Sequence, residues 1–368
     1  MRFTCTQQAL NKAINTVIKA VSSRTTIPIL KGILFKVEGG ELILLSSNLD
    51  ISIETRIPVQ DAEEGSCVIN ARLISEIVRR LPNSLMSFSS DERDNLKLVC
   101  LGSEFMIVTM SADEYPQTIN SAEGDQCSVN IKEICELVRK TSFAASIDEK
   151  KGILTGCLLK FKNDGMEMVA LDGFRMAIAR TDALSGIEGK IVIPASLMND
   201  VSKLIAEAEE SEEVVINIDP KRVGFRYDST KISVRQLEGE FIAYEGILPK
   251  EWKTRFTVER EELMSSIERA SLFAKEGKNN LIKMNILPGI IKINSRSEEG
   301  NVNESVLAET EGSDLLIGFN SKYIIDTLRA VDDESMAFEM TGSNSACLIK
   351  PVEGEDFVYL VLPVRMTV

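Results

Sequence analysis

The sequence predicts an α+β fold made of three tandem copies of one domain. The chain of 368 residues repeats itself with a period of about 125 residues, each repeat contains two segments with helical periodicity, and the segments between them are rich in β-branched residues. A period of this length is too long for a solenoid unit and suits a small domain. We therefore expect domains at residues 1–125, 126–250 and 251–368.

The repeat is clearest between residues 29–56 and residues 153–180, which align without a gap. Both segments begin with Ile-Leu-x-Gly and end on Arg. A weaker third copy begins at Leu281, and the endings at residues 237–249 and 352–363 also match. Several elements recurring in the same order indicate that a whole domain has been repeated.

Two helices are expected in each repeat. The segments that open the repeats begin at Phe3, Val129 and Phe256, and those near the middle begin at Ile69, Ile193 and Phe319. Each has a polar or small residue at the helix start and then apolar residues spaced by three or four. The predicted apolar stripes are Leu73, Ile77 and Leu81 in one helix, and Tyr323, Ile324, Leu328 and Val331 in another.

Short strands fill the rest of each repeat. Residues 96–100, 214–218 and 290–294 are rich in β-branched side chains and are bounded by Gly, Asn, Asp or Pro. These segments predict mainly antiparallel sheets, covered on one side by the two helices of each repeat.

The composition limits where the protein works. Hydrophobic residues make up 44% of the chain, which is enough for three cores. No stretch of them is long enough to span a membrane. The N-terminus has no signal-peptide pattern, so we expect a cytoplasmic protein. The seven cysteines contain no C-x-x-C pair, which predicts buried free thiols in a reducing compartment.

The sequence gives no sign of catalysis. It has no histidine, which excludes Ser-His-Asp and Cys-His catalysis and histidine zinc sites, and it has neither of the Gly-rich nucleotide-binding motifs. Carboxylate runs at residues 61–64 and 207–213 can bind Mg²⁺ in principle, but such runs are usually solvated loops or helix faces. We therefore predict no catalytic residue, metal or cofactor.

The charge is unevenly distributed. A formal net charge of −14 argues against general DNA binding, because phosphate neutralisation requires Lys and Arg. The predicted helices nevertheless carry many cations: Lys12, Lys19, Arg72, Arg79, Arg80, Lys132, Arg139, Lys140, Lys322 and Arg329, with Arg24 after the first helix. The charge pattern of each helix, taken alone, is typical of a solvated helix face. Together they allow a weakly basic surface on an acidic body.

Five segments resemble one family, the bacterial DNA polymerase III β subunits, which are the sliding clamps of replication. They are MRFTCTQQALNKAI (1–14), SSRTTIPILKGILF (22–35), ALDGFRMAIAR (170–180), GFNSKYIIDTL (318–328) and YLVLPVRM (359–366). The resemblance implies a head-to-tail homodimer whose DNA-clamp domains form a closed ring, with sheets outside and helices lining a hole for duplex DNA. It implies a non-catalytic processivity factor, which needs only weak phosphate contacts without sequence specificity.

The resemblance also implies positions for DNA contact. Those are Arg24 and Arg72 first, followed by Lys12, Arg79, Lys132, Lys140 and Lys322. The second helix of repeat two departs from the family's basic pattern, because Ala195 and Ser196 stand at its start.

A partner-peptide groove between repeats two and three is the second implied site. The matching positions are Leu154, Leu171, Gly173, Phe174, Arg175, Met176, Ile247, Leu360, Leu362, Pro363, Val364, Arg365 and Met366. Its implied partners are the replicative polymerase α subunit, the ATP-dependent clamp loader, and other polymerases and repair proteins with clamp-binding motifs. Leu171 and Phe174 replace the family's usual Thr and His, and Ile242 and Gly246 replace residues that are often Pro and Arg. An altered peptide preference is therefore expected.

Ring closure is implied to use apolar residues of repeats one and three. They match Phe105 and Ile107 on an edge strand and Leu272 and Phe273 on a helix. Joining the edge strands of two protomers would leave no sheet edge exposed.

The residues by themselves also fit two alternatives from other classes of protein. One is an acidic three-repeat scaffold that binds peptides and never encircles DNA. The other is a metal-dependent enzyme of nucleic-acid metabolism that uses the carboxylate runs.

Overall fold

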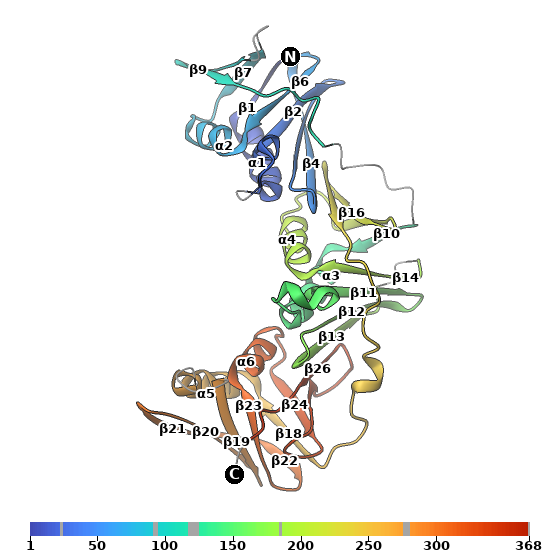
Figure 1. The fold of residues 1–368 in the computed structure, drawn as a ribbon, viewed down its shortest axis with the longest axis vertical. Helices are drawn as coiled ribbons and strands as arrows, with labels where there is room; N and C mark the ends of the chain where they lie inside the picture. The colour runs from blue at the N-terminus through green and yellow to red at the C-terminus, as the bar shows by residue number, and fades with distance from the viewer. Residues whose placement is uncertain (23–24, 91–94, 117–124, 184–185, 275–279, 367–368) are drawn as a thin grey trace. The chain divides into compact units, whose positions relative to one another are not determined.

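The computed structural model describes residues 1–368 except 23–24, 91–94, 117–124, 184–185, 275–279 and 367–368 (Figure 1). The chain divides into two compact units. Unit 1 comprises Met1–Lys132 with Asp200–Gln236, and unit 2 comprises Glu133–Asn199 with Leu237–Val368. Two of the three unit boundaries fall inside the helices α3 (Ile131–Thr141) and α4 (Ala195–Ile205), and the third lies between Gln236 and Leu237.

Unit 1 contains two antiparallel sheets. The larger has the order β10 (Asp125–Asn130), β15 (Glu213–Ile218), β16 (Arg222–Tyr227), β17 (Thr230–Arg235), β4 (Ile51–Pro58), β3 (Glu41–Ser47), β2 (Gly32–Glu38) and β6 (Gly65–Asn70). The smaller has the order β5 (Gln60–Glu63), β1 (Arg2–Thr6), β7 (Leu85–Ser90), β8 (Asn95–Cys100) and β9 (Ser103–Val108). Its helices are α1 (Gln7–Val17), which continues as η1 (Ile18–Ala20), η2 (Pro28–Lys31) and α2 (Ala71–Arg80).

Unit 2 repeats this plan. Its larger sheet has the order β14 (Gly189–Pro194), β11 (Gly156–Lys162), β12 (Gly165–Leu171), β13 (Arg175–Thr181), β26 (Phe357–Val361), β25 (Cys347–Pro351), β24 (Ser335–Met340), β18 (Thr254–Glu259) and β22 (Glu309–Gly312). The smaller has the order β21 (Gly300–Leu307), β20 (Ile290–Ser297), β19 (Leu281–Leu287) and β23 (Leu315–Asn320). Its helices are η3 (Ser142–Ala144), η4 (Glu149–Thr155), η5 (Glu245–Ile247), α5 (Arg260–Ala274) and α6 (Ser321–Arg329). The predicted α+β class with antiparallel sheets is confirmed.

The larger sheets cross the repeat junctions. In unit 1, β17 of the second repeat pairs with β4 of the first, where Thr230 lies opposite Thr55 and the two hydroxyls are 3.0 Å apart. In unit 2, β13 of the second repeat pairs with β26 of the third, where Ile178 lies opposite Val358. Because each junction strand finds a partner, its backbone groups are satisfied within the chain. This pairing also explains why repeat two is divided between the units.

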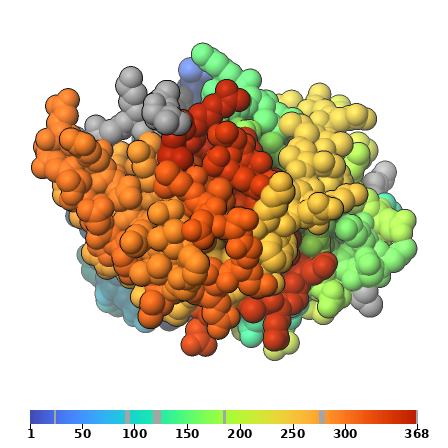
Figure 2. Space-filling model, turned by 90° about the horizontal axis from the view of Figure 1, so that it is seen from below, coloured from blue at the N-terminus to red at the C-terminus, as the bar shows by residue number. Residues whose placement is uncertain are grey.

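The chain between the second and third repeats lies on the surface of unit 2. Figure 2 shows this yellow segment, residues 237–250, beside the red C-terminal strands. Phe241, Tyr244 and Leu248 pack into one apolar cluster with Leu348 and Leu360 of those strands. The segment is therefore anchored by burial of its apolar side chains.

Helix starts follow the sequence signals. The side chain of Thr6 accepts a hydrogen bond from the Ala9 N–H at the start of α1, and Asn70 accepts one from the Leu73 N–H at the start of α2. Such caps satisfy backbone N–H groups that have no partner within the helix, and each stabilises it by about 1 kcal/mol. The predicted polar residues at these helix starts are confirmed.

The stripe predicted for α2 is wrong in part. Leu73 is 46% exposed and Ile77 is half-buried, whereas Ile74 and Val78 are fully buried and are followed by the buried Leu81. Both sets have helical spacing, so the sequence alone does not distinguish the face that meets the core. In α6 the stripe is confirmed for Ile324 and Leu328, and Tyr323 lies half-buried beside them. Val331 is also buried, but it lies after the end of the helix.

The cores contain stacked aromatic rings and free thiols. Phe3 stacks on Phe88 at 4.5 Å in repeat one, and Phe256 stacks on Phe338 at 4.6 Å in repeat three. All seven cysteines are free, and all but the half-buried Cys135 are buried, as predicted. None of the helices in the described ranges has the length and apolar content of a membrane span.

Candidate functional site

A polar stripe runs along α1 and its continuation η1. Gln8, Lys12, Asn15 and Lys19 are exposed at helical spacing, opposite the buried Leu10, Ile14 and Val17. The Lys12 ammonium lies 2.5 Å from a carboxylate oxygen of Glu209, and the Lys19 ammonium lies 2.9 Å from one of Glu207. Both cations of the stripe are thus paired with carboxylates of the same unit.

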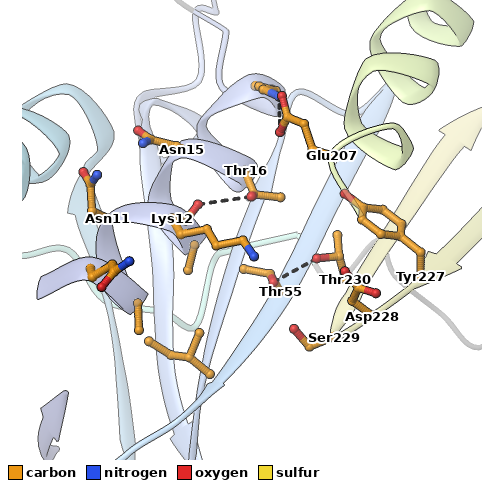
Figure 3. Close-up of a pocket in the computed structure, with 15 residues that line it drawn as sticks. Asn11, Lys12, Asn15, Thr16, Thr55, Glu207, Tyr227, Asp228, Ser229 and Thr230 are labelled. Carbon is orange, nitrogen blue, oxygen red and sulfur yellow. Dashed lines mark hydrogen bonds and ion pairs between the residues drawn. The ribbon is translucent and has the colours of Figure 1, made fainter. Parts of the chain in front are cut away.

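A cavity of about 580 Å³ lies beside this stripe, between α1 and the β16–β17 turn. Figure 3 shows Lys12 and Asn11 on the helix side and Tyr227, Asp228 and Thr230 on the strand side. The Asn11 side-chain oxygen is buried without a hydrogen-bond partner among the described residues. Burial raises the pKa of the Tyr227 hydroxyl, so the phenol stays protonated.

The helices α2 and α3 carry the same charge motif. In α2, Glu76 pairs with Arg79 at 2.8 Å and with Arg80 at 3.1 Å. In α3, Glu136 pairs with Arg139 at 2.6 Å and more distantly with Lys140. The hydrogen bond from Arg79 lowers the pKa of the Glu76 carboxyl below its ordinary value. Each glutamate therefore supplies a counter-charge for two cations on its own helix.

Three of the predicted DNA-contact residues are exposed and have no carboxylate within 4 Å in the described part of the chain. They are Arg72 of α2, Lys132 of α3 and Lys322 of α6. Each is the second residue of its helix and follows a capping asparagine by two positions, namely Asn70, Asn130 and Asn320. A cation there adds to the positive end of the helix dipole. The Asn-x-Arg/Lys pattern marks one helix start in each repeat, but it also occurs within β8 at residues 95–97 and within β20 at residues 294–296, so sequence reasoning missed it.

The other predicted DNA contacts have different surroundings. Lys12 and Arg79 are ion-paired, as described. The Lys140 side chain is only 19% exposed, and its ammonium lies 5.7 Å from the centre of the Phe357 ring. Arg24 lies outside the described residues.

The β12–β13 turn is the centre of the second predicted site. Asp172 accepts hydrogen bonds from the N–H groups of Phe174 at 2.8 Å and Arg175 at 3.1 Å. Gly173 has a φ of +91°, a conformation that glycine adopts without steric cost. The turn leaves Phe174 55% exposed.

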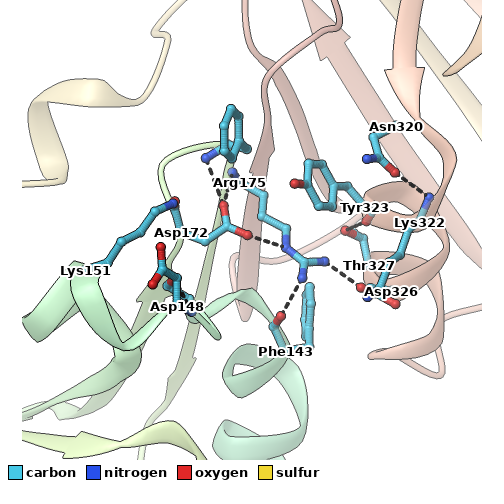
Figure 4. A network of polar contacts seen from close by, with 12 residues as sticks. Phe143, Asp148, Lys151, Asp172, Arg175, Asn320, Lys322, Tyr323, Asp326 and Thr327 are labelled. Atoms are coloured by element: carbon cyan, nitrogen blue, oxygen red, sulfur yellow. Dashed lines mark hydrogen bonds and ion pairs between the residues drawn. The ribbon is translucent and has the colours of Figure 1, made fainter. Parts of the chain in front are cut away.

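Arg175 is buried beneath this turn (Figure 4). Its Nε donates to Asp172 at 3.1 Å, Nη1 to Asp326 of α6 at 2.6 Å, and Nη2 to the Phe143 carbonyl at 2.8 Å. The guanidinium also lies over the Tyr323 ring at 4.6 Å. The three guanidinium nitrogens are all used inside unit 2, so Arg175 positions the turn against α6 and η3.

Phe174 has two neighbours that sequence reasoning missed. Its ring stacks on Tyr323 at 6.4 Å between centroids, and the Lys151 ammonium lies 5.3 Å from its centre. The C-terminal segment completes the surroundings, because the Leu362 N–H donates to the Phe174 carbonyl at 2.9 Å. No spacing in the sequence connects residues 151, 174 and 323, since they come from a 3₁₀ segment, a turn and a helix.

The predicted groove residues divide by burial. Leu171, Met176 and Leu360 are at most 6% exposed and belong to the core cluster under the segment of residues 237–250. Leu154 packs against the same cluster. The exposed ones are Gly173, Phe174, Ile247, Leu362 and Arg365, and Pro363, Val364 and Met366 are half-buried. The surface open to a partner is therefore smaller than the predicted set.

A polar network holds the segment of residues 237–250 on the sheet. The buried Tyr244 hydroxyl donates to Glu167 of β12, and the Lys160 ammonium donates to the Tyr244 oxygen at 2.6 Å. Arg180 of β13 donates to Glu167 at 2.8 Å. Sequence reasoning missed this network because its members lie on four separate elements.

The strands β9 and β21 end the two smaller sheets. On β9, Met106 is 57% exposed and Val108 is 80% exposed. Ile107, predicted for an interface, is instead buried at 3% within repeat one because it points to the sheet's inner face, and Phe105 is half-buried. On α5, Leu272 is 64% exposed, whereas Phe273 is half-buried beside Gly300.

Within the described ranges, no three Asp, Glu or Cys side chains gather as metal ligands would.

Comparison with known proteins covers the whole chain. Residues 1–119, 128–242 and 245–365 match the N-terminal, central and C-terminal domain profiles of the DNA polymerase III beta subunit. The beta sliding clamp of Staphylococcus epidermidis is 30% identical, with 99% of each chain covered. The chain belongs to the DNA polymerase III beta subunit family. The crystal structure of the Bacillus subtilis DNA polymerase sliding clamp matches this beta subunit with a TM-score of 0.95 at 32% identity, and that of the Thermotoga maritima beta subunit with 0.92 at 27%, each over 100% of both chains.

Membership of the beta subunit family fits the absence of catalytic motifs. Sliding clamps form a non-catalytic family, and the chain has no histidine and no nucleotide-binding motif. The prediction that this beta subunit is not an enzyme agrees with its relatives.

Proposed function

We propose that two copies of this beta subunit close head to tail into a ring around duplex DNA. As a sliding clamp, the chain is a processivity factor of DNA replication. The observation that carries the proposal is the match of all three repeats, in order and over the whole chain, to solved clamps. The alternative of an acidic scaffold that never encircles DNA finds no support in these relatives.

The proposed DNA surface is the set of helices with exposed cations. Arg72, Lys132 and Lys322 come from three different repeats and carry no carboxylate partner in the described part of the chain. They can therefore take phosphate groups directly. With so few free cations on an acidic body, contact would be weak and independent of sequence, which a topologically closed ring tolerates and sliding requires.

We propose three domains within each protomer, at residues 1–125, 126–250 and 251–368. The exposed part of the predicted groove, with Phe174, Ile247 and Leu362, is proposed to take a short peptide with hydrophobic anchors. The proteins proposed to contain this peptide are the replicative polymerase α subunit, the ATP-dependent clamp loader, and other polymerases and repair proteins.

Ring closure is proposed to join the ends of the smaller sheets. The unpaired edge of β9 from one protomer would meet the unpaired edge of β21 from its partner, with Leu272 at the contact. Backbone pairing would then continue from one protomer to the next.

Retention on circular DNA tests the proposed function. The beta subunit is loaded onto nicked circular plasmid with a bacterial clamp loader and ATP, and the products are separated by gel filtration. We expect protein to elute with the circles in high salt and to be released when a restriction enzyme linearises them, because a closed ring leaves only at an end. Equal retention on linear and circular DNA, or none on either, would reject encirclement.

A further inference from the structure

The lysines of α1 are held by a run of glutamates that follows α4. This acidic segment is defined as residues 207–213, Glu-Ala-Glu-Glu-Ser-Glu-Glu. Glu207 pairs with Lys19 through both carboxylate oxygens at 2.9 and 3.0 Å, and Glu209 pairs with Lys12 at 2.5 Å. Lys12 is one of the predicted DNA contacts, and both lysines lie on the polar stripe of α1.

The acidic segment is fixed in place by Asp228 in the β16–β17 turn. The Asp228 carboxylate accepts hydrogen bonds from the backbone N–H groups of Glu209 at 3.0 Å, Glu210 at 3.3 Å and Ser211 at 2.8 Å. In return, the Asp228 N–H donates to the Ser211 hydroxyl at 2.9 Å. Burial alone would raise the pKa of Asp228, but these hydrogen bonds outweigh it and lower that pKa. The anchor therefore stays ionised at neutral pH.

This anchoring increases the free energy that the two ion pairs contribute. An exposed pair between two free side chains contributes little, because both must be ordered to form it. Here the backbone that carries Glu207 and Glu209 is already ordered by Asp228, so the carboxylates remain near the lysines. They act as a tethered counter-anion at a high local concentration.

We infer that Glu207 and Glu209 set the strength of DNA contact by α1. They form ion pairs with Lys19 and Lys12, and a DNA phosphate must displace these carboxylates before it can bind either lysine. The inference rests on the proposed function, with α1 facing the duplex as the predicted DNA contact at Lys12 implies. A phosphate that takes a paired lysine frees a carboxylate, which gathers a cation from solution. The exchange then yields little net counterion release, the main source of affinity for duplex. Such self-neutralisation favours loose contact and sliding.

The same segment contains a matched control. Glu210 and Glu212 are exposed, and neither pairs with a cation among the described residues. Replacing both by glutamine removes the same charge from the same loop as replacing Glu207 and Glu209. Any difference between the two double variants therefore reports the ion pairs and not the overall field.

The test is the salt dependence of binding to a short fluorescein-labelled duplex, followed by anisotropy. We compare the wild type, the test variant E207Q/E209Q and the control variant E210Q/E212Q. The test variant frees Lys12 and Lys19 from their glutamates. The slope of log affinity against log salt should therefore steepen for the test variant by about two units relative to the control. Affinity at low salt should rise about three- to tenfold, as two exposed ion pairs allow. Coincident slopes for the two double variants would overturn the inference.

A third comparison assigns the effect to the lysines. Adding K12A and K19A to E207Q/E209Q should return the slope to that of the wild type, and a slope that stays steep would also overturn the inference. Retention of the wild type on circular DNA is measured in parallel. Loss of retention would indicate failure of the proposed function, whereas normal retention with coincident slopes would reject this inference alone.

Discussion

At the scale of single residues, Arg175 connects three parts of unit 2. Its guanidinium contacts Asp172 in the β12–β13 turn, Asp326 in α6 and the carbonyl of Phe143 in η3. The side chain is 9% exposed, so its charge is stable there only because both carboxylates and the carbonyl satisfy it. The family resemblance predicts that Arg175 belongs to the proposed peptide groove. The structure adds that it holds the exposed Phe174 in position.

Removing the Arg175 side chain should destabilise unit 2. In Arg175→Ala the largely buried carboxylates of Asp172 and Asp326 lose their counter-charge, which we expect to lower the free energy of unfolding by about 3–5 kcal/mol. Urea unfolding followed by the fluorescence of Trp252, the single tryptophan, reports on this unit.

The matched control is Arg296→Ala on β20. Arg296 is exposed and makes no ion pair within the described ranges, so its removal should change the free energy by no more than about 0.5 kcal/mol. If the two variants unfolded at the same urea concentration, the Arg175 network would contribute no net stability.

At the scale of elements, one buried carboxylate holds the segment of residues 237–250 on its sheet. Burial alone would raise the pKa of Glu167, but hydrogen bonds from Tyr244 and Arg180 and the charge of Lys162 outweigh it and lower that pKa. Because the pKa of the Glu167 carboxyl is lower in the folded protein than in the unfolded chain, its ionised form stabilises the fold at pH values above the unfolded-state pKa. That stability is lost as pH falls through the folded value.

Glu167→Gln should therefore change both stability and its pH dependence. At pH 7 we expect the variant to unfold more easily by about 1–3 kcal/mol, because Arg180 and Tyr244 lose a charged acceptor. Below about pH 4.3, the ordinary value for glutamate, the wild type should lose this advantage and the two curves should converge. Urea unfolding at several pH values between neutral and acidic measures the convergence.

Glu309→Gln is the control for this pH experiment. Glu309 is exposed on β22 and makes no ion pair among the described residues, so its variant should follow the wild-type curve throughout. Parallel curves for Glu167→Gln and the wild type down to low pH would show that Glu167 is not the acid-sensitive group.

At the scale of the whole molecule, the proposed ring depends on the outer edges of β9 and β21, which have no strand partner among the described residues. Strands at both internal repeat junctions are paired within the chain. In the smaller sheets, β9 and β21 are each one end strand, and the other end strands are β5 and β23. Exposed apolar side chains accompany both ends: Met106 and Val108 on β9, and Leu307 on β21 with Leu272 on the nearby α5. Apolar edges of this kind favour pairing with another chain.

Leu272→Glu should convert the proposed dimer to monomers. Leu272 is 64% exposed within the protomer, so the substitution leaves the fold intact and places an unpaired charge only in the proposed interface. Sedimentation velocity at micromolar concentration measures the outcome. Val352→Glu, at an exposed apolar residue in the β25–β26 turn, should remain dimeric, and a dimeric Leu272→Glu would reject this interface.

By itself, the sequence determined the threefold repeat, the helix starts, the antiparallel strands, the buried free thiols and the family. These features depend on local composition, on spacing within one element or on motif identity, and all three can be read without knowledge of the fold. The apolar stripe of α2 shows the limit. Two faces had helical spacing, and only packing decided that Ile74 and Val78 meet the core.

The tertiary structure alone decided which cations are free. Lys12, Arg72 and Lys132 look alike in the sequence, yet Lys12 is paired with Glu209, which lies far along the chain, and the other two are not paired among the described residues. It likewise decided that Ile107 and Arg175 are buried. The physical reason is the same in each case: ion pairs and burial join residues from distant parts of the chain, and no local pattern specifies which of them the fold will bring together.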